Sequence, residues 1–171
     1  MKWFIKCLRQ YADFKGRARR KEYWWFAVFN FIFTIIILIP FMVQMFKLGM
    51  TGVDMSDEEL YGVMLTSPYM WIYVIYYLAM LIPGIAVCVR RLHDIGRSGW
   101  WFLLILGASI LNFVSRMIAE TNFIALMVMM LLILAISIIG LVWMFTDSEY
   151  GPNKYGPNPK GEGNTEVPAE N

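Results

Sequence analysis

The sequence predicts an all-α membrane protein with four transmembrane helices. Hydrophobic residues form 58% of the 171-residue chain and charged residues only 16%, whereas a typical soluble domain carries about 25% charged residues. Four stretches hold no charged side chain: 23–46, 60–89, 98–115 and 121–146. These apolar runs are continuous, which favours helices over the alternating strands of a membrane barrel.

The length of each run justifies a span. A helix needs about 20 mostly apolar residues to cross roughly 30 Å of hydrocarbon. We therefore expect spans over about 23–46, 69–89, 98–116 and 122–145, the third at the short end of the range. The first run is too long for the apolar core of a signal peptide and has no small-residue cleavage site, so it is expected to remain as an anchor.

A short amphipathic helix is expected ahead of the first span, over residues 2–14. Its apolar side chains recur at the spacing of one helix face: Phe4, Cys7, Leu8, Tyr11 and Phe14. Lys2, Lys6 and Arg9 fall elsewhere around the helix, so we expect it to lie at the membrane interface with its apolar face towards the hydrocarbon. Gly16 is expected to end it.

The distribution of basic residues predicts the orientation. Lys and Arg number eight in 1–22, three in 90–97 and two in 147–171, but only one each in 47–59 and 116–120. The positive-inside rule then places both termini and the 90–97 loop in the cytoplasm.

The remaining segments are polar. The predicted external loop 47–59 is acidic, with Asp54, Asp57, Glu58 and Glu59. After the last span, Gly-Pro-Asn occurs at 151–153 and again at 156–158, which indicates two tight turns. We expect residues 1–159 to form one membrane domain and 160–171 to be a disordered polar tail.

The stretch "RRLHDIGRSGWW", residues 90–101, joins the second and third predicted spans. Arg90 and Arg91 close one helix, Arg97 precedes the next, and Ser98 stands at its N-cap position. Cations beside a helix N-terminus suit a phosphate or a carboxylate, so these four residues are candidates for binding an anion or lipid headgroup. Three arginines before the first span are expected on the rim of the same site: Arg17, Arg19 and Arg20.

His93 and Asp94 are weak catalytic candidates, since a carboxylate can orient an imidazole base. Adjacent residues rarely face each other on a helix, and the chain holds no second histidine for a metal site. No metal or cofactor is therefore expected. The structural alternative is that Asp94 pairs with an arginine and His93 hydrogen-bonds within the loop.

Three motifs together resemble a known family: "FKGRARRKEYW" at 14–24, "RRLHDIGRSGWW" at 90–101 and "YGPNKYGPNP" at 150–159. In this order they resemble the bacterial inner-membrane family catalogued as domain of unknown function 805. The resemblance implies a small polytopic membrane protein and supplies no reaction. The segment 47–62 looks longer and more acidic than in a short member of that family. We expect the three motif segments to contact one another on the cytoplasmic side.

The leading functional hypothesis is a non-enzymatic module whose cytoplasmic face binds an anionic lipid headgroup, a phosphorylated ligand or a partner protein. One alternative is a membrane enzyme acting on a phosphorylated lipid, with His93 as base or nucleophile. Another is a channel or transporter subunit, which the absence of ionisable residues in the span cores disfavours. The expected partners are anionic membrane lipids, with a second copy or a membrane protein as further candidates and no nucleic acid.

Overall fold

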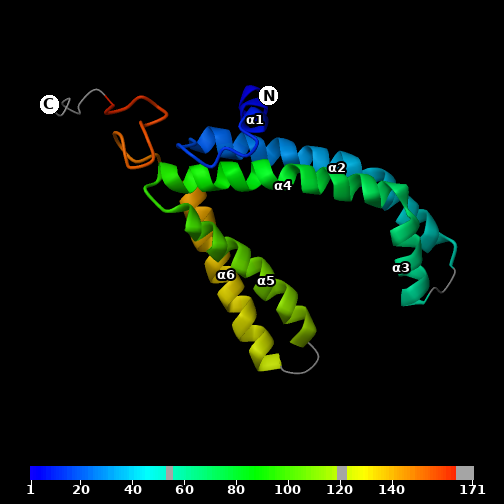
Figure 1. Ribbon diagram of the computed structural model, residues 1–171. Coiled ribbons are helices and arrows are strands. Elements are labelled where there is room, and N and C mark those ends of the chain that lie inside the picture. Colours follow the sequence, from blue (N-terminus) through cyan, green and yellow to red (C-terminus); the bar gives the residue numbers. More distant parts are fainter. Residues whose placement is uncertain (53–55, 119–122, 165–171) are drawn as a thin grey trace.

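The regular secondary structure of the chain is helical throughout the part that the computed structural model describes, which is residues 1–52, 56–118 and 123–164. The helices run in the order α1 (Lys2–Arg9), α2 (Arg20–Met50), α3 (Asp57–Thr66), α4 (Pro68–Asp94), η1 (Gly99–Trp101), α5 (Phe102–Ile118) and α6 (Phe123–Phe145). Two helix pairs, α2 with α4 and α5 with α6, meet at one end of the molecule and diverge from there (Figure 1).

The end where the two pairs meet is called here the polar end. There α4 and α6 finish, while α2 and α5 begin. Both the segment 10–19 and the C-terminal segment 146–164 also lie at this end, so charged side chains from distant parts of the sequence come together (Figure 1).

Three helices within the described residues are long and apolar enough to cross a membrane: α2, α4 and α6. The sequence predicted their apolar cores and underestimated the ends of α2 and α4. The third predicted span, 98–116, begins as a 3₁₀ turn at Gly99–Trp101 and continues as α5, and its apolar stretch is shorter than those of the other three.

The helix α3 was not predicted. It begins with a capping box, in which the Ser56 hydroxyl accepts from the Glu59 N–H and the Glu59 carboxylate accepts from the Ser56 N–H at 2.9 Å. Asp57 and Glu58 fill its first turn, where carboxylates are favoured. The acidic end of the predicted loop is thus helical, and Asp54 lies outside the described residues.

The N-terminal helix α1 is shorter than the predicted 2–14, because the residues after Arg9 make tertiary and turn contacts instead. The Tyr11 hydroxyl donates to the Ala79 carbonyl at 2.6 Å, and the Asp13 carboxylate accepts from the Lys15 N–H. Phe4 is buried on α2, with its ring centroid 5.5 Å from that of Phe26. The part of the apolar face formed by Phe4 and Cys7 therefore packs against the protein and does not face the hydrocarbon, contrary to the expectation from the sequence.

Cys7 lies on the buried face of α1, and its burial raises the pKa of the thiol to about 11. At pH 8 only about 0.1% of such a thiol is thiolate, the form that reacts with alkylating reagents. We expect Cys7 to resist N-ethylmaleimide in detergent at pH 8 and to react rapidly once the protein is unfolded, as followed by intact-mass spectrometry. Rapid labelling of Cys7 in the folded protein would contradict this packing of α1.

The C-terminal segment contains the two predicted turns, which the structure confirms. The glycines Gly151 and Gly156 both have positive φ, of 69° and 132°. In each triplet the asparagine side chain accepts from the backbone N–H two residues on: Asn153 from Tyr155 at 3.0 Å and Asn158 from Lys160 at 2.9 Å. The repeated sequence therefore forms a repeated local structure.

Candidate functional site

Asp94 is the centre of a buried charge network at the polar end. Its carboxylate accepts from Arg17 Nε at 3.1 Å, from Arg91 Nη1 at 2.7 Å and from the Ser148 hydroxyl at 2.6 Å. The side chains of Asp94, Arg17 and Arg91 are at most 1% exposed. We call Arg17, Arg91, Asp94 and Ser148 the Asp94 clasp, because they join three segments of the chain.

Arg17 holds the C-terminal segment in place through backbone carbonyls. Its Nη2 donates to Glu149 at 2.6 Å and to Asp94 at 3.3 Å, while its Nη1 donates to Gly151 at 2.7 Å and to Gly156 at 3.3 Å. Those two glycines open the two Gly-Pro-Asn triplets, so one guanidinium contacts both turns. This fork of donors is a property of arginine that lysine lacks.

Arg91 satisfies the carbonyls at the end of α6. It donates to Trp143 at 3.3 Å, to Met144 at 3.4 Å and to Thr146. The last carbonyls of a helix have no partner within the helix and carry its negative dipole end, so a buried cation there is stabilising. Arg91 therefore joins the ends of α4 and α6.

Arg90 lies on the other side of α4, towards α1, and is 1% exposed. Its Nη1 donates to the Gln10 side chain, and its carbonyl accepts from the Ala18 N–H at 3.0 Å. Nearby, Lys6 pairs with the buried Glu22 carboxylate at 2.9 Å. Arg90 thus contributes to the docking of α1 and the segment that follows it.

His93 and Asp94 contact different groups. The His93 ring stacks on Tyr155, with centroids 3.8 Å apart and planes 7° from parallel. Its Nδ1 lies 3.2 Å from the Gly16 carbonyl, which can only accept, so the proton is on Nδ1. Asp94 pairs with arginines, as the structural alternative expected, whereas His93 contacts the Gly16 carbonyl of a different segment and not a group of its own loop.

Arg97 and Ser98 make contacts at the start of η1, the 3₁₀ turn that leads into α5. The Arg97 guanidinium lies over the Trp143 ring at 4.5 Å and over the Trp101 ring at 5.8 Å. The Ser98 hydroxyl accepts from the Trp100 N–H at 3.4 Å, as the sequence predicted for an N-cap residue. These contacts fix the turn between α4 and α5.

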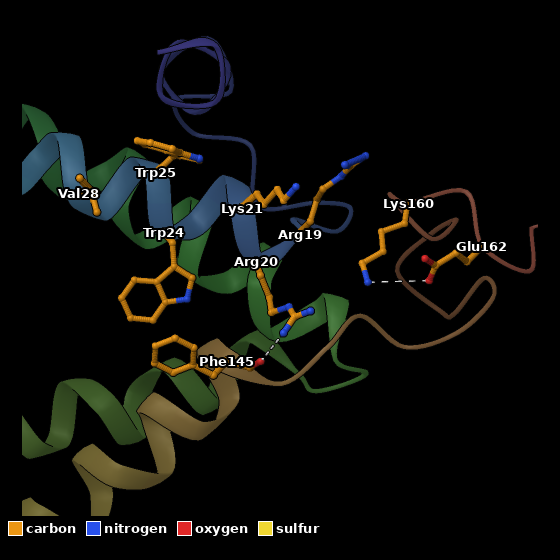
Figure 2. Close-up of a pocket in the computed structure, with 9 residues that line it drawn as sticks. All are labelled: Arg19, Arg20, Lys21, Trp24, Trp25, Val28, Phe145, Lys160 and Glu162. Atoms are coloured by element: carbon orange, nitrogen blue, oxygen red, sulfur yellow. Dashed lines mark hydrogen bonds and ion pairs between the residues drawn. The ribbon is translucent and has the colours of Figure 1, made fainter.

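Arg19 and Arg20 instead line an open cleft beside the start of α2 and the end of α6, with a volume of about 810 Å³. We call it the basic cleft. Figure 2 shows its nine lining residues: Arg19, Arg20, Lys21, Trp24, Trp25, Val28, Phe145, Lys160 and Glu162. Four are cations and four are aromatic or aliphatic, so the cleft has both a charged part and an apolar part.

One wall of the basic cleft is held by Asp147. Arg20 pairs with it at 2.9 Å and Lys160 at 2.5 Å, and Arg20 also donates to the Phe145 carbonyl at 3.1 Å. The hydrogen bond from Lys160 is the main cause that lowers the pKa of the Asp147 carboxyl below its usual value. Glu162 lies 3.9 Å from Lys160 (Figure 2).

The other cations of the basic cleft are less compensated. Arg19 donates to the Pro159 carbonyl at 2.9 Å and lies 5.2 Å from the centre of the Trp3 ring. Lys21 is exposed, and among the described residues no carboxylate forms an ion pair with Arg19 or Lys21. A negatively charged ligand therefore meets two cations without bound counter-charges.

The apolar part of the basic cleft is aromatic. Trp24 packs on Phe145, with ring centroids 4.5 Å apart, and Trp25 is 46% exposed (Figure 2). Neither tryptophan nor Lys21 or Lys160 was among the candidate site residues from the sequence. The signal was present for Lys21 and the tryptophans, since they continue the motif "RARRKEYWW". Lys160 lies 139 residues after Lys21, where the sequence gave no indication of contact.

The structure thus separates the predicted site residues into two groups. It brings together the three motif segments, as predicted, through Arg17, Asp94 and Gly151. Arg17, Arg90, Arg91 and Arg97 make their contacts outside the basic cleft, whereas Arg19 and Arg20 line it.

Long apolar helices and a charged polar end define an integral membrane protein of several helices. The chain belongs to the family described as a protein of unknown function, DUF805, which it matches over residues 11–157. It is 39% identical to the inner membrane protein YhaH of Escherichia coli K12 over 107 residues, which are 62% of this chain and 74% of YhaH. It is 33% identical to the inner membrane protein YhaI of the same strain over 160 residues, 94% of this chain and 97% of YhaI. No solved structure matches the chain.

Proposed function

We propose that this protein is a multi-pass inner-membrane protein whose cytoplasmic face binds the phosphate of an anionic lipid headgroup in the basic cleft. The observation that carries the proposal is the composition of that cleft, in which cations lie next to exposed aromatic side chains. A membrane lipid has the same division between a charged headgroup and apolar chains. Basic pockets between transmembrane helices on the cytoplasmic side are suited to anionic lipids.

The topology that belongs to this proposal has four spans and both termini in the cytoplasm. Together η1 and α5, over Gly99–Ile118, reach the length of a short span. The excess of basic residues in 1–22 and 90–97 supports the cytoplasmic position of the polar end. In this arrangement α1 lies at the interface, with Ile5 45% exposed and able to contact lipid.

Binding rather than catalysis is the proposed activity, because the catalytic candidates are engaged in structural contacts. Both carboxylate oxygens of Asp94 accept hydrogen bonds from the clasp, and His93 is covered by Tyr155 on one face. Within the basic cleft, Arg19 and Lys21 have no carboxylate partner among the described residues and can pair with a ligand.

The test is native mass spectrometry of the protein extracted gently from its own membrane, beside an Arg19→Gln/Lys21→Gln variant. Each cation near an anionic membrane surface contributes roughly 1 kcal/mol, so the double variant is expected to hold anionic lipid about 30-fold more weakly. The matched control is Lys15→Gln/Lys47→Gln, which removes the same charge from two exposed lysines outside the cleft. Equal lipid retention by the two double variants would overturn the proposal.

A further inference from the structure

The charges around the basic cleft do not balance. Its four cations, from Arg19, Arg20, Lys21 and Lys160, face the carboxylates of Glu162 and the adjoining Asp147. Asp147 and Glu162 both pair with Lys160, and Asp147 also pairs with Arg20. Within the described part of the chain, two cations of the basic cleft are therefore left without a carboxylate partner, Arg19 and Lys21.

Those two cations flank the first residue of α2 and both line the basic cleft. Arg19 is the N-cap residue of α2, with an extended backbone, and Lys21 is the second residue of the helix. Arg19 contacts the Trp3 ring and the Pro159 carbonyl, whereas Lys21 is exposed and has no carboxylate partner among the described residues. The two uncompensated cations exceed the single negative charge of one phosphate diester.

We propose, on the basis of the function proposed above, that the basic cleft selects a lipid whose headgroup carries two phosphates. Diphosphatidylglycerol (cardiolipin), in which one glycerol joins two phosphates, has that chemistry. One phosphate pairs with Arg19 and the other with Lys21, so that the two negative charges of the lipid match the two uncompensated cations. Arg20 and Lys160 remain bound to Asp147 and form the wall of the cleft.

The apolar side of the basic cleft suits the chains of such a lipid. Trp25 and Val28 are 46% and 43% exposed, and they lead along α2 to Phe31 and Ile32, which are 65% and 42% exposed. Tryptophan at a membrane interface lies at headgroup level, with apolar residues beyond it towards the hydrocarbon. The acyl chains are therefore expected to follow this face of α2.

The test uses the full-length protein in phosphatidylcholine nanodiscs and counts retained guest lipids by native mass spectrometry. The guests are diphosphatidylglycerol, phosphatidylglycerol with one phosphate diester, and phosphatidic acid with one phosphate monoester, at equal total phosphate. We expect the two-phosphate lipid to be retained about fivefold more than phosphatidylglycerol, the effect of one further cation–phosphate pair. Either Arg19→Gln or Lys21→Gln should abolish that preference, while Lys21→Arg and the control Lys47→Gln should keep it.

The outcomes separate the two proposals. Equal retention of diphosphatidylglycerol and phosphatidylglycerol, or a preference for phosphatidic acid, would overturn the two-phosphate inference and leave anionic lipid binding intact. A preference that survives both single substitutions would overturn it as well. Retention of every anionic guest at the level of phosphatidylcholine would overturn the proposed function itself. Thermal unfolding of each variant in the same nanodiscs shows that the compared proteins are folded.

Discussion

Replacing Asp94 with asparagine is expected to lower the free energy of unfolding by about 3–5 kcal/mol, the usual cost of removing one partner from a buried ion pair. Asparagine has nearly the same shape, so the substitution mainly removes the charge. Arg17 and Arg91 would then remain buried without a counter-charge, and one carboxylate oxygen would become an N–H₂ group facing donors. Denaturant unfolding in mixed micelles, followed by tryptophan fluorescence, measures the effect.

The control for this prediction is Asp147→Asn. Asp147 also pairs with two cations, Arg20 and Lys160, but its side chain is 54% exposed. Exposed ion pairs contribute little, and the expected loss is less than about 1 kcal/mol. Equal effects of the two substitutions would show that the Asp94 clasp does not stabilise the fold.

Most of the helical structure was predictable from the uncharged runs. A run of apolar residues sets the position of a span by itself, which is why α2, α4 and α6 match the expectation. The divergence of the two helix pairs was not predictable, because it depends on which helix surfaces pack together. The helix α3 was missed although Ser56 and Glu59 have the spacing of a capping box, since the apolar run beginning at residue 60 was assigned to a loop and a span.

The candidate site was predictable in composition and less so in geometry. The sequence placed the basic motifs at one end of the molecule and foresaw that Asp94 pairs with an arginine. It could not show that Arg17 and Arg91 bind carbonyls at the end of α6 and beyond, because those partners lie 52 to 139 residues away. An arginine that donates to distant backbone carbonyls has the same kind of sequence neighbours as an arginine that binds a ligand. The sequence alone therefore does not distinguish the two.

Arg17→Met is the second substitution with a large expected effect, and its effect is expected to be local. It removes the three hydrogen bonds to backbone carbonyls of the C-terminal segment, those of Glu149, Gly151 and Gly156. We expect a loss of about 3–5 kcal/mol in the docking of residues 147–164, because the buried carboxylate loses one of its two cationic partners. Limited trypsin digestion should then cut rapidly after Lys154 and Lys160.

Two further variants separate charge from geometry in that experiment. Arg17→Lys keeps the charge near Asp94 but has no planar fork of donors, so cleavage after Lys154 should be faster than in the parent protein and slower than in Arg17→Met. Arg9→Met makes the same change at an exposed arginine of α1 and should leave the C-terminal segment as resistant as in the parent. If Arg17→Lys proved as resistant as the parent, the charge of Arg17 alone would hold the segment, and the hydrogen bonds to the two Gly-Pro-Asn turns would not be needed.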